Sequence, residues 1–233
     1  MLKNIPYLLL RFPNTTMRAT ITEHSIPYIY DTVMMAVELG FKQITFCPNA
    51  YEDWDEDIRE EFYKQFDKVG YYIYKELMNG NYPIRVNPIN NYFSKLYSIY
   101  KDELKFENRV LRCGLGTTSC AVTPNGDIIP CQEKTSHPTT ILGNVFDGIN
   151  PKIHEEYLKQ VFDSINNIHC EKNCGYKEKL ICLSDLCPSR LEDLNYQFST
   201  SGCMFVRVAT AVTKRLFYLC NYSPIPIIQQ YFN

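Results

Sequence analysis

The first part of the chain alternates between the apolar pattern of a strand and that of a helix. Residues Thr16 to Thr22 are rich in β-branched side chains and alternate in polarity, which predicts a strand. A helix is expected from Ser25 to Leu39, because Ser25 can cap its start and Gly40 can end it. The pattern further predicts a strand at 43–48, a long helix that opens on acidic residues 52–56 and ends near Gly80, and a short strand at 83–86.

This order of strand, helix, strand and helix predicts parallel strands joined by right-handed crossovers. Two such units can neither close a barrel nor cover both faces of a sheet. Residues 1–88 are therefore interpreted as the last part of a larger α/β domain, with a small self-contained α/β layer as the alternative. The apolar run from Ile5 to Leu10 is too short for a signal peptide and Arg11 interrupts it, so it is interpreted as a strand or strand entry.

The rest of the chain is less regular. Residues 89–110 are expected to form a helical connector. From Leu111 onward, cysteine, glycine, proline and turn residues interrupt the pattern. Two further helices are expected, from about Pro151 to Asn166 and from Met204 to Leu219. Residues 206–233, which contain most of the second helix, are assigned as a C-terminal helix and tail.

Composition excludes some classes of function. The 233 residues are 45% hydrophobic and carry a formal net charge of -2, which gives no reason to expect nucleic acid or an anionic membrane as a partner. No segment is apolar and long enough to span a bilayer, and a cytoplasmic location is expected. Ten cysteines are unusual, and seven of them fall between Cys113 and Cys187. Without an export signal, such spacing favours metal binding, while disulfides remain the alternative.

The first group of cysteines is Cys113-x6-Cys120-x10-Cys131. Pro124, Asn125 and Gly126 between the last two predict a β-hairpin, because proline presets a turn and Asn-Gly tolerates positive φ. Pro124 favours a three-residue loop over a two-residue loop. Either loop returns Cys131 to within a residue of Cys120, so the hairpin gathers two thiols at its open end.

The second group has wider gaps. Its members are Cys170-x3-Cys174-x7-Cys182-x4-Cys187, followed after fifteen residues by Cys203. Eight thiolates in two groups suit two four-coordinate sites, and both zinc and iron–sulfur clusters accept thiolates. The four histidines share no spacing with these cysteines and receive no role. Cys47 and Cys220 lie outside the pattern and are expected to be buried free thiols.

The cysteine region resembles the SPASM domain, which follows the barrel of many radical S-adenosylmethionine (SAM) enzymes that mature peptides and proteins. The resemblance rests on Cys113-x12-Gly126-x4-Cys131, on the hairpin text from Thr123 to Cys131, on Leu142-Gly143-Asn144-Val145, and on the later cysteines. It covers residues 111–205. In family members the four-cysteine cluster has the spacing C-x2-C-x5-C-x3-C, and each gap between cysteines is longer in this sequence.

The resemblance implies two auxiliary [4Fe-4S] clusters with interleaved ligands. The first would bind Cys113, Cys120, Cys131 and Cys187, and the second Cys170, Cys174, Cys182 and Cys203. The implied fold is the C-terminal part of a partial TIM-like radical SAM barrel, followed by a small irregular α+β SPASM domain. Arg18, in Arg18-Ala19-Thr20-Ile21-Thr22, is implied as a contact of the SAM carboxylate, and a structural ion pair is the alternative.

One motif of the family is missing. The radical SAM cluster needs C-x3-C-x2-C; Cys170-x3-Cys174 begins like it, but Lys177 occupies the third position. The chain is therefore expected to be the C-terminal portion of an enzyme, inactive alone, that binds SAM only with a separately encoded or missing N-terminal half. The resemblance further implies a peptide or protein substrate and an electron donor such as a ferredoxin or flavodoxin.

The residue directly after the third cysteine restricts the class of reaction that the resemblance implies. Sulfatase-maturating relatives carry a basic Asp directly after the third cysteine, where this chain has Gln132. A thioether- or carbon-crosslinking maturase is therefore expected rather than formylglycine formation. Glu133 is a candidate base, and a solvated surface carboxylate is the alternative. Two rival functions stay open: a zinc-stabilised module that binds peptides or proteins, and a stand-alone two-cluster electron carrier.

Overall fold

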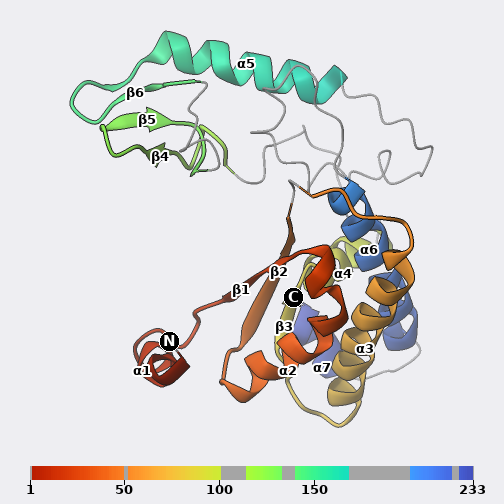
Figure 1. Ribbon diagram of the computed structural model, residues 1–233. Coiled ribbons are helices and arrows are strands. Elements are labelled where there is room, and N and C mark those ends of the chain that lie inside the picture. Colours follow the sequence, from red (N-terminus) through yellow and green to blue (C-terminus); the bar gives the residue numbers. More distant parts are fainter. Residues whose placement is uncertain are drawn as a thin grey trace. The chain divides into compact units, whose positions relative to one another are not determined.

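The computed structural model describes residues 2–49, 52–100, 114–132, 140–167, 200–221 and 226–232. The chain divides into two compact units, one combining Met1–Phe106 with Ser199–Asn233 and the other spanning Glu107–Phe198. Each unit has a sheet of its own (Figure 1). No helix among the described residues has an apolar stretch that would cross a bilayer.

The sheet of the first unit is parallel, as the strand–helix alternation predicted. Its strands are β1 (Met17–Ile21), β2 (Gln43–Pro48) and β3 (Arg85–Asn87), in that order across the sheet. The segment η2 (Glu23–Tyr28) with α2 (Ile29–Glu38) connects β1 to β2, and α3 (Ile58–Met78) connects β2 to β3. The helices α4 (Ile89–Tyr100), α6 (Thr200–Asn221) and α7 (Pro226–Phe232) also belong to this unit.

Residues 2–11 are helical, so the strand or strand entry predicted at Ile5 to Leu10 is wrong. The chain opens with η1 (Leu2–Asn4) and α1 (Ile5–Arg11). Pro6 lies in the first turn of α1, where a missing N–H has no consequence. The backbone N–H of Phe12 donates to the Leu8 carbonyl at 2.8 Å and closes the last turn. The short apolar run is compatible with both elements, and these local bonds decide for the helix.

The helix after β1 begins earlier than predicted. Thr22, not Ser25, is the N-cap: its hydroxyl accepts from the Ser25 N–H at 3.3 Å, and the Ser25 hydroxyl accepts from the Thr22 N–H at 2.9 Å. This reciprocal pair is a capping box, which satisfies two backbone donors at once. The first turn is a 3-10 helix, and α2 starts only at Ile29. Gly40 ends the segment with φ +86°, as predicted.

The two faces of the parallel sheet differ in chemistry. Ile44 and Val86 are paired in register and fully buried, and Figure 1 shows α2, α3 and α6 on the same side of this sheet. The opposite face, here called the polar face, carries exposed or half-buried side chains. Its members are Arg18, Thr20, Gln43, Thr45, Cys47, Arg85 and Asn87.

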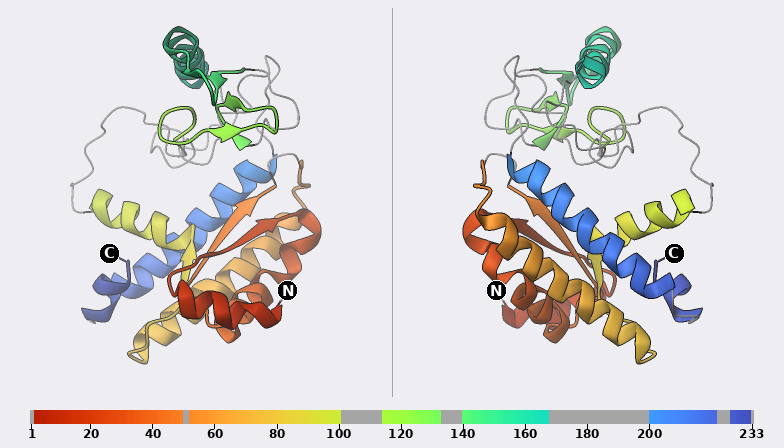
Figure 2. Two further views of the ribbon diagram at one scale, coloured as in Figure 1. Left: turned by 90° about the vertical axis from the view of Figure 1, so that its left-hand side faces the viewer. Right: turned by 90° about the vertical axis from the view of Figure 1, so that its right-hand side faces the viewer.

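Aromatic side chains hold the helical layer of the first unit together. Phe62 and Phe66 of α3 lie 6.1 and 6.0 Å from Phe205 of α6, measured between ring centroids, and all three rings are buried. Phe93 of α4 stacks on Phe232 of α7 at 3.5 Å. The two helices α3 and α6 run alongside each other in both views of Figure 2. These contacts make α6, which lies far from α3 in the sequence, a full member of the first unit.

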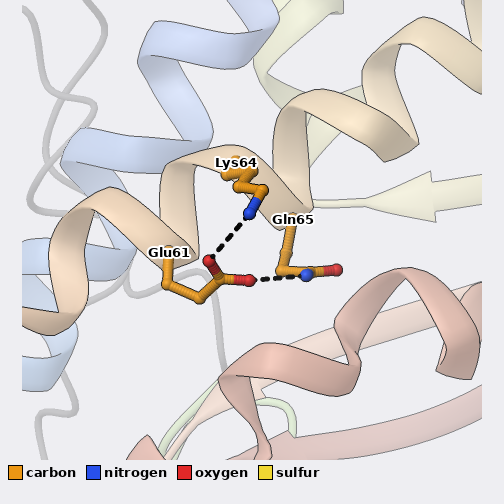
Figure 3. A network of polar contacts seen from close by, with 3 residues as sticks. All are labelled: Glu61, Lys64 and Gln65. Carbon is orange, nitrogen blue, oxygen red and sulfur yellow. Dashed lines mark hydrogen bonds and ion pairs between the residues drawn. The ribbon is translucent and has the colours of Figure 1, made fainter.

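A polar network lies on α3 (Figure 3). The Gln65 side-chain amide donates to one Glu61 carboxylate oxygen at 2.7 Å, and the Lys64 ammonium lies 3.4 Å from the other. The Gln65 hydrogen bond, helped by Lys64, holds the pKa of Glu61 below its ordinary value. Because Gln65 is buried, Glu61 supplies the partner that this amide needs.

The second unit is built on an antiparallel sheet. Its strands are β4 (Ala121–Val122), β5 (Asp127–Ile129), β6 (Gly143–Asn144) and β7 (Gly148–Ile149), in that order. The helix α5 (Pro151–Asn167) follows, one residue longer than predicted. A small core of buried side chains joins helix and sheet: Leu115, Leu142, Tyr157 and Val161.

Candidate metal centre

The hairpin between β4 and β5 has the three-residue loop that Pro124 favours. Ala121 pairs with Ile129, and the Thr123 N–H donates to the Asp127 carbonyl at 2.9 Å. Pro124, Asn125 and Gly126 form the loop between them, and Gly126 has φ +86°. This is a tight turn followed by a left-handed glycine, a common connection for hairpins of this length.

The register of the hairpin brings Cys120 and Cys131 together. Since Ala121 pairs with Ile129, Cys120 lies opposite Pro130, one residue from Cys131. Cys120 is exposed, and Cys131 is half-buried against the small core of the second unit. The predicted return of the hairpin, which brings Cys131 to within a residue of Cys120 along the ladder, is confirmed. Their role as metal ligands stays a prediction.

The loop at 114–119, here called the glycine loop, forms backbone hydrogen bonds to residues next to the cysteines of the first group. The Ser119 N–H donates to the Gly114 carbonyl at 2.9 Å, which joins the neighbours of Cys120 and Cys113. The Gly116 N–H lies 3.0 Å from the Ser119 carbonyl and 3.3 Å from the carbonyl of Pro130, the neighbour of Cys131. Gly114 and Gly116 have φ of +71° and +63°, a conformation that favours glycine. Cys113 itself lies outside the described residues.

Sequence reasoning missed one residue of this region. His154 of α5 donates through its Nε2 to the Gly116 carbonyl. One turn further along α5, the Tyr157 ring covers the same glycine: a Cβ atom at Gly116 would lie 3.3 Å from Tyr157 Cε1. The only sequence signal was that His154 precedes the expected inward-facing Tyr157 by three residues, which places both on one helix face.

The second group of predicted ligands falls mostly outside the described residues. Cys170, Cys174, Cys182 and Cys187 lie there, as does the candidate base Glu133. Cys203 is described: it is half-buried in the first turns of α6, a helix of the first unit. No group of three or more metal-ligating side chains occurs among the described residues. Both ligand sets therefore remain predictions.

The candidate SAM contact lies on the polar face of the parallel sheet. Arg18 is exposed on β1 and pairs in register with Thr45, which pairs in turn with Asn87. The Asn87 amide donates to the Thr45 hydroxyl at 3.4 Å. These three residues form one polar row across the sheet, and an exposed guanidinium in such a row suits a carboxylate. Contact with SAM stays a prediction.

The two remaining cysteines differ. Burial raises the pKa of the Cys220 thiol to about 12, and only 4% of this residue is exposed, as predicted for a buried free thiol. Cys47 is only half-buried, so the prediction of a buried thiol is wrong for it. Its position on the polar face, in register with Thr20, keeps it out of the apolar layer.

Comparison with known proteins identifies the fold. No protein-family model matches the chain, and no curated protein matches its sequence. The solved structure of hexahistidine-tagged anSMEcpe with bound AdoMet is similar over 97% of this chain and 60% of its own, with 16% identity and a TM-score of 0.60. Native anSMEcpe with bound AdoMet and the Cp18Cys peptide is similar over 93% and 61%, with 14% identity and a TM-score of 0.55.

The chain thus spans about three fifths of the length of these solved structures. anSMEcpe is an anaerobic sulfatase-maturating enzyme of the radical SAM/SPASM class. At this level of identity, the likeness concerns the fold. This chain is a mixed α/β protein with a parallel sheet, and its fold is similar to that of anSMEcpe over most of its length.

Proposed function

We propose that this chain is the cluster-binding C-terminal part of a radical SAM/SPASM enzyme that modifies a peptide or protein. Residues 1–88 would form the late part of the barrel, and residues 111–205 the SPASM domain. The first [4Fe-4S] cluster would bind Cys113, Cys120, Cys131 and Cys187, and the second Cys170, Cys174, Cys182 and Cys203. One observation carries the proposal: the hairpin and the glycine loop fasten the backbone beside three of these cysteines together.

The residues present fit such a group. Thiolates are the soft ligands that iron–sulfur clusters require, and the exposed Cys120 is accessible to one. Gly114 and Gly116 have positive φ, which lets the short loop turn back toward Cys120. When bound, auxiliary clusters of this kind accept or relay electrons, and burial and hydrogen bonds to sulfur tune their potentials.

The polar face supports the barrel assignment. Parallel sheets are usually covered on both faces, yet Arg18 and Thr20 remain exposed here. A row of polar side chains at the centre of a sheet suits a ligand face better than a second helical layer. Arg18 would hold the carboxylate of SAM, and the peptide substrate would approach the same face.

The printed sequence lacks C-x3-C-x2-C, so the chain alone is expected to bind clusters without cleaving SAM. Cleavage would need a polypeptide that supplies this motif. Mixing with a separately encoded radical SAM half tests this part: deoxyadenosine should form only in the mixture, and its absence from every such mixture would count against the split arrangement.

Anaerobic reconstitution with iron and sulfide tests the cluster proposal. We expect a brown protein with about eight iron atoms per chain, as two [4Fe-4S] clusters require. Cys120→Ser should retain about four iron atoms. Cys220→Ser is the matched control, because Cys220 is buried in α6 and is not one of the proposed ligands, and this variant should retain about eight iron atoms, as many as wild type. A colourless protein that takes up zinc instead would refute the proposal and favour the zinc-stabilised module.

A further inference from the structure

Gly116 is the point at which three parts of the second unit meet: its own loop, the hairpin and α5. Its N–H points at the carbonyls of Ser119 and Pro130, 3.0 and 3.3 Å away. Its carbonyl accepts from His154 of α5. A Cβ atom at this glycine would lie 3.3 Å from Tyr157 Cε1, so a side chain here would press on the Tyr157 ring. The loop that leads from Cys113 to Cys120 is therefore held on one side by the hairpin and on the other by α5.

The position of His154 is set by the start of α5. Asn150 caps this helix, because its side-chain oxygen accepts from the backbone N–H groups of Lys152 and Ile153 at 3.0 and 3.3 Å. The Asn150 N–H donates to the Leu142 carbonyl at 2.7 Å and fixes the cap beside β6. His154 follows one turn later, and a buried Tyr157 one turn after that. The Asn150 cap and the buried Tyr157 thus fix the start of α5, and with it the position of the His154 imidazole beside the glycine loop.

The contact requires a donor at this position. A backbone carbonyl only accepts hydrogen bonds, so the His154 Nε2 must carry the proton in this contact. The half-buried Gly116–His154 contact joins residues 38 positions apart in the sequence. An aliphatic side chain of similar size would fill the space and leave the carbonyl without this partner.

We propose that His154 is a positioning residue for the first cluster site. Through Gly116 it holds the loop between Cys113 and Cys120 against the strand end that carries Cys131. This inference rests on the proposed function, since it presumes that these cysteines bind one cluster. Groups that orient metal ligands without touching the metal typically change affinity about 10- to 100-fold when removed, and we expect a loss of this size for His154→Leu at the first site only.

The test compares three variants of the full chain after anaerobic reconstitution. His154→Leu removes the donor, His154→Gln keeps an N–H donor near the same place, and Glu155→Leu is the control on an exposed neighbouring position. With about eight equivalents of iron per chain and no excess, His154→Leu should hold about four iron atoms per chain and lose one of two reduced-cluster signals in electron paramagnetic resonance. His154→Gln and Glu155→Leu should keep about eight iron atoms and both signals.

The outcomes separate the two claims. If wild type binds two clusters and His154→Leu matches it in iron content and spectrum, the role of His154 is refuted while the proposed function stands. If His154→Leu loses both clusters and His154→Gln does not rescue either, the residue is merely structural and the inference is again refuted. If wild type itself binds no iron, the proposed function fails. Hydrogen exchange of the metal-free protein then still tests the contact, because amides at 114–120 should exchange faster in His154→Leu alone.

Discussion

Gly70 lies where α3 and α6 pack directly against each other. A Cβ atom at this glycine would lie 2.9 Å from Cγ1 of Val212, closer than carbon atoms approach in folded proteins, and Val212 is 1% exposed. Gly70→Ala therefore has two opposing effects. Alanine favours a helix interior by about 1 kcal/mol over glycine, whereas an extra methyl in a filled core costs about 1–3 kcal/mol. The net expectation is a loss of about 1 kcal/mol in the free energy of unfolding.

The sign of the effect should reverse when the obstructing methyl is removed. In the Val212→Ala background, the methyl group that Gly70→Ala introduces has space, and only the helix preference remains. Gly70→Ala should then stabilise the protein by about 1 kcal/mol relative to Val212→Ala alone. The two substitutions are expected to couple by about 1–3 kcal/mol, a range typical of residues in contact.

The measurement can be confined to the first unit. Trp54 is the only tryptophan of the chain, is 3% exposed, and packs against Phe62 of α3 at 5.5 Å between ring centroids. Its fluorescence in urea titrations therefore reports unfolding of this unit. If the two substitutions are additive within about 0.5 kcal/mol, the close packing of α3 on α6 is not a property of the protein in solution.

Three further predictions concern the hairpin, a carboxylate and a thiol. Gly126→Ala places a side chain at φ +86° and 3.1 Å from Val145 Cγ2. It should lower the free energy of unfolding by about 1–2 kcal/mol and speed hydrogen exchange of the amides at 121–129. Unchanged exchange would contradict the proposed turn. The Trp54 indole N–H holds the pKa of Glu52 below its ordinary value, with the Glu23 N–H adding to the effect. The contribution of the Glu52 carboxylate is thus present at neutral pH and lost as the pH falls through that lowered pKa. Glu52→Gln should therefore melt below wild type at neutral pH, and circular dichroism should show the difference shrink as the pH is lowered through that pKa. Cys220, with its pKa raised to about 12 by burial, should resist iodoacetamide at pH 8 until urea unfolds the chain, and mass spectrometry of the native protein would show otherwise if the thiol were accessible.

Short-range features of this protein followed from the sequence. The strands β1 and β2, the parallel arrangement of the first sheet and the helix α5 agree with the predictions to within a residue or two. The hairpin is the clearest case, because Pro124 and Gly126 restrict the backbone directly and the register of Cys120 with Cys131 follows from the turn alone. The hairpin and α5 depend on contacts within a few positions along the chain, whereas the parallel arrangement follows from the order of strands and helices.

Other features of this protein could not be predicted from the sequence, mainly because they depend on contacts between residues far apart along the chain. Two local features, the helix α1 in place of a strand and the cap at Thr22 in place of Ser25, were mispredicted because short patterns fit two local solutions whose energies are close. The polar face emerged only when strand pairing set Arg18 beside Thr45. The contact of His154 with Gly116 joins residues that no spacing rule connects. Local backbone preferences act over a few residues and can be recognised in a sequence, whereas the choice of a partner 38 positions away depends on how whole elements pack.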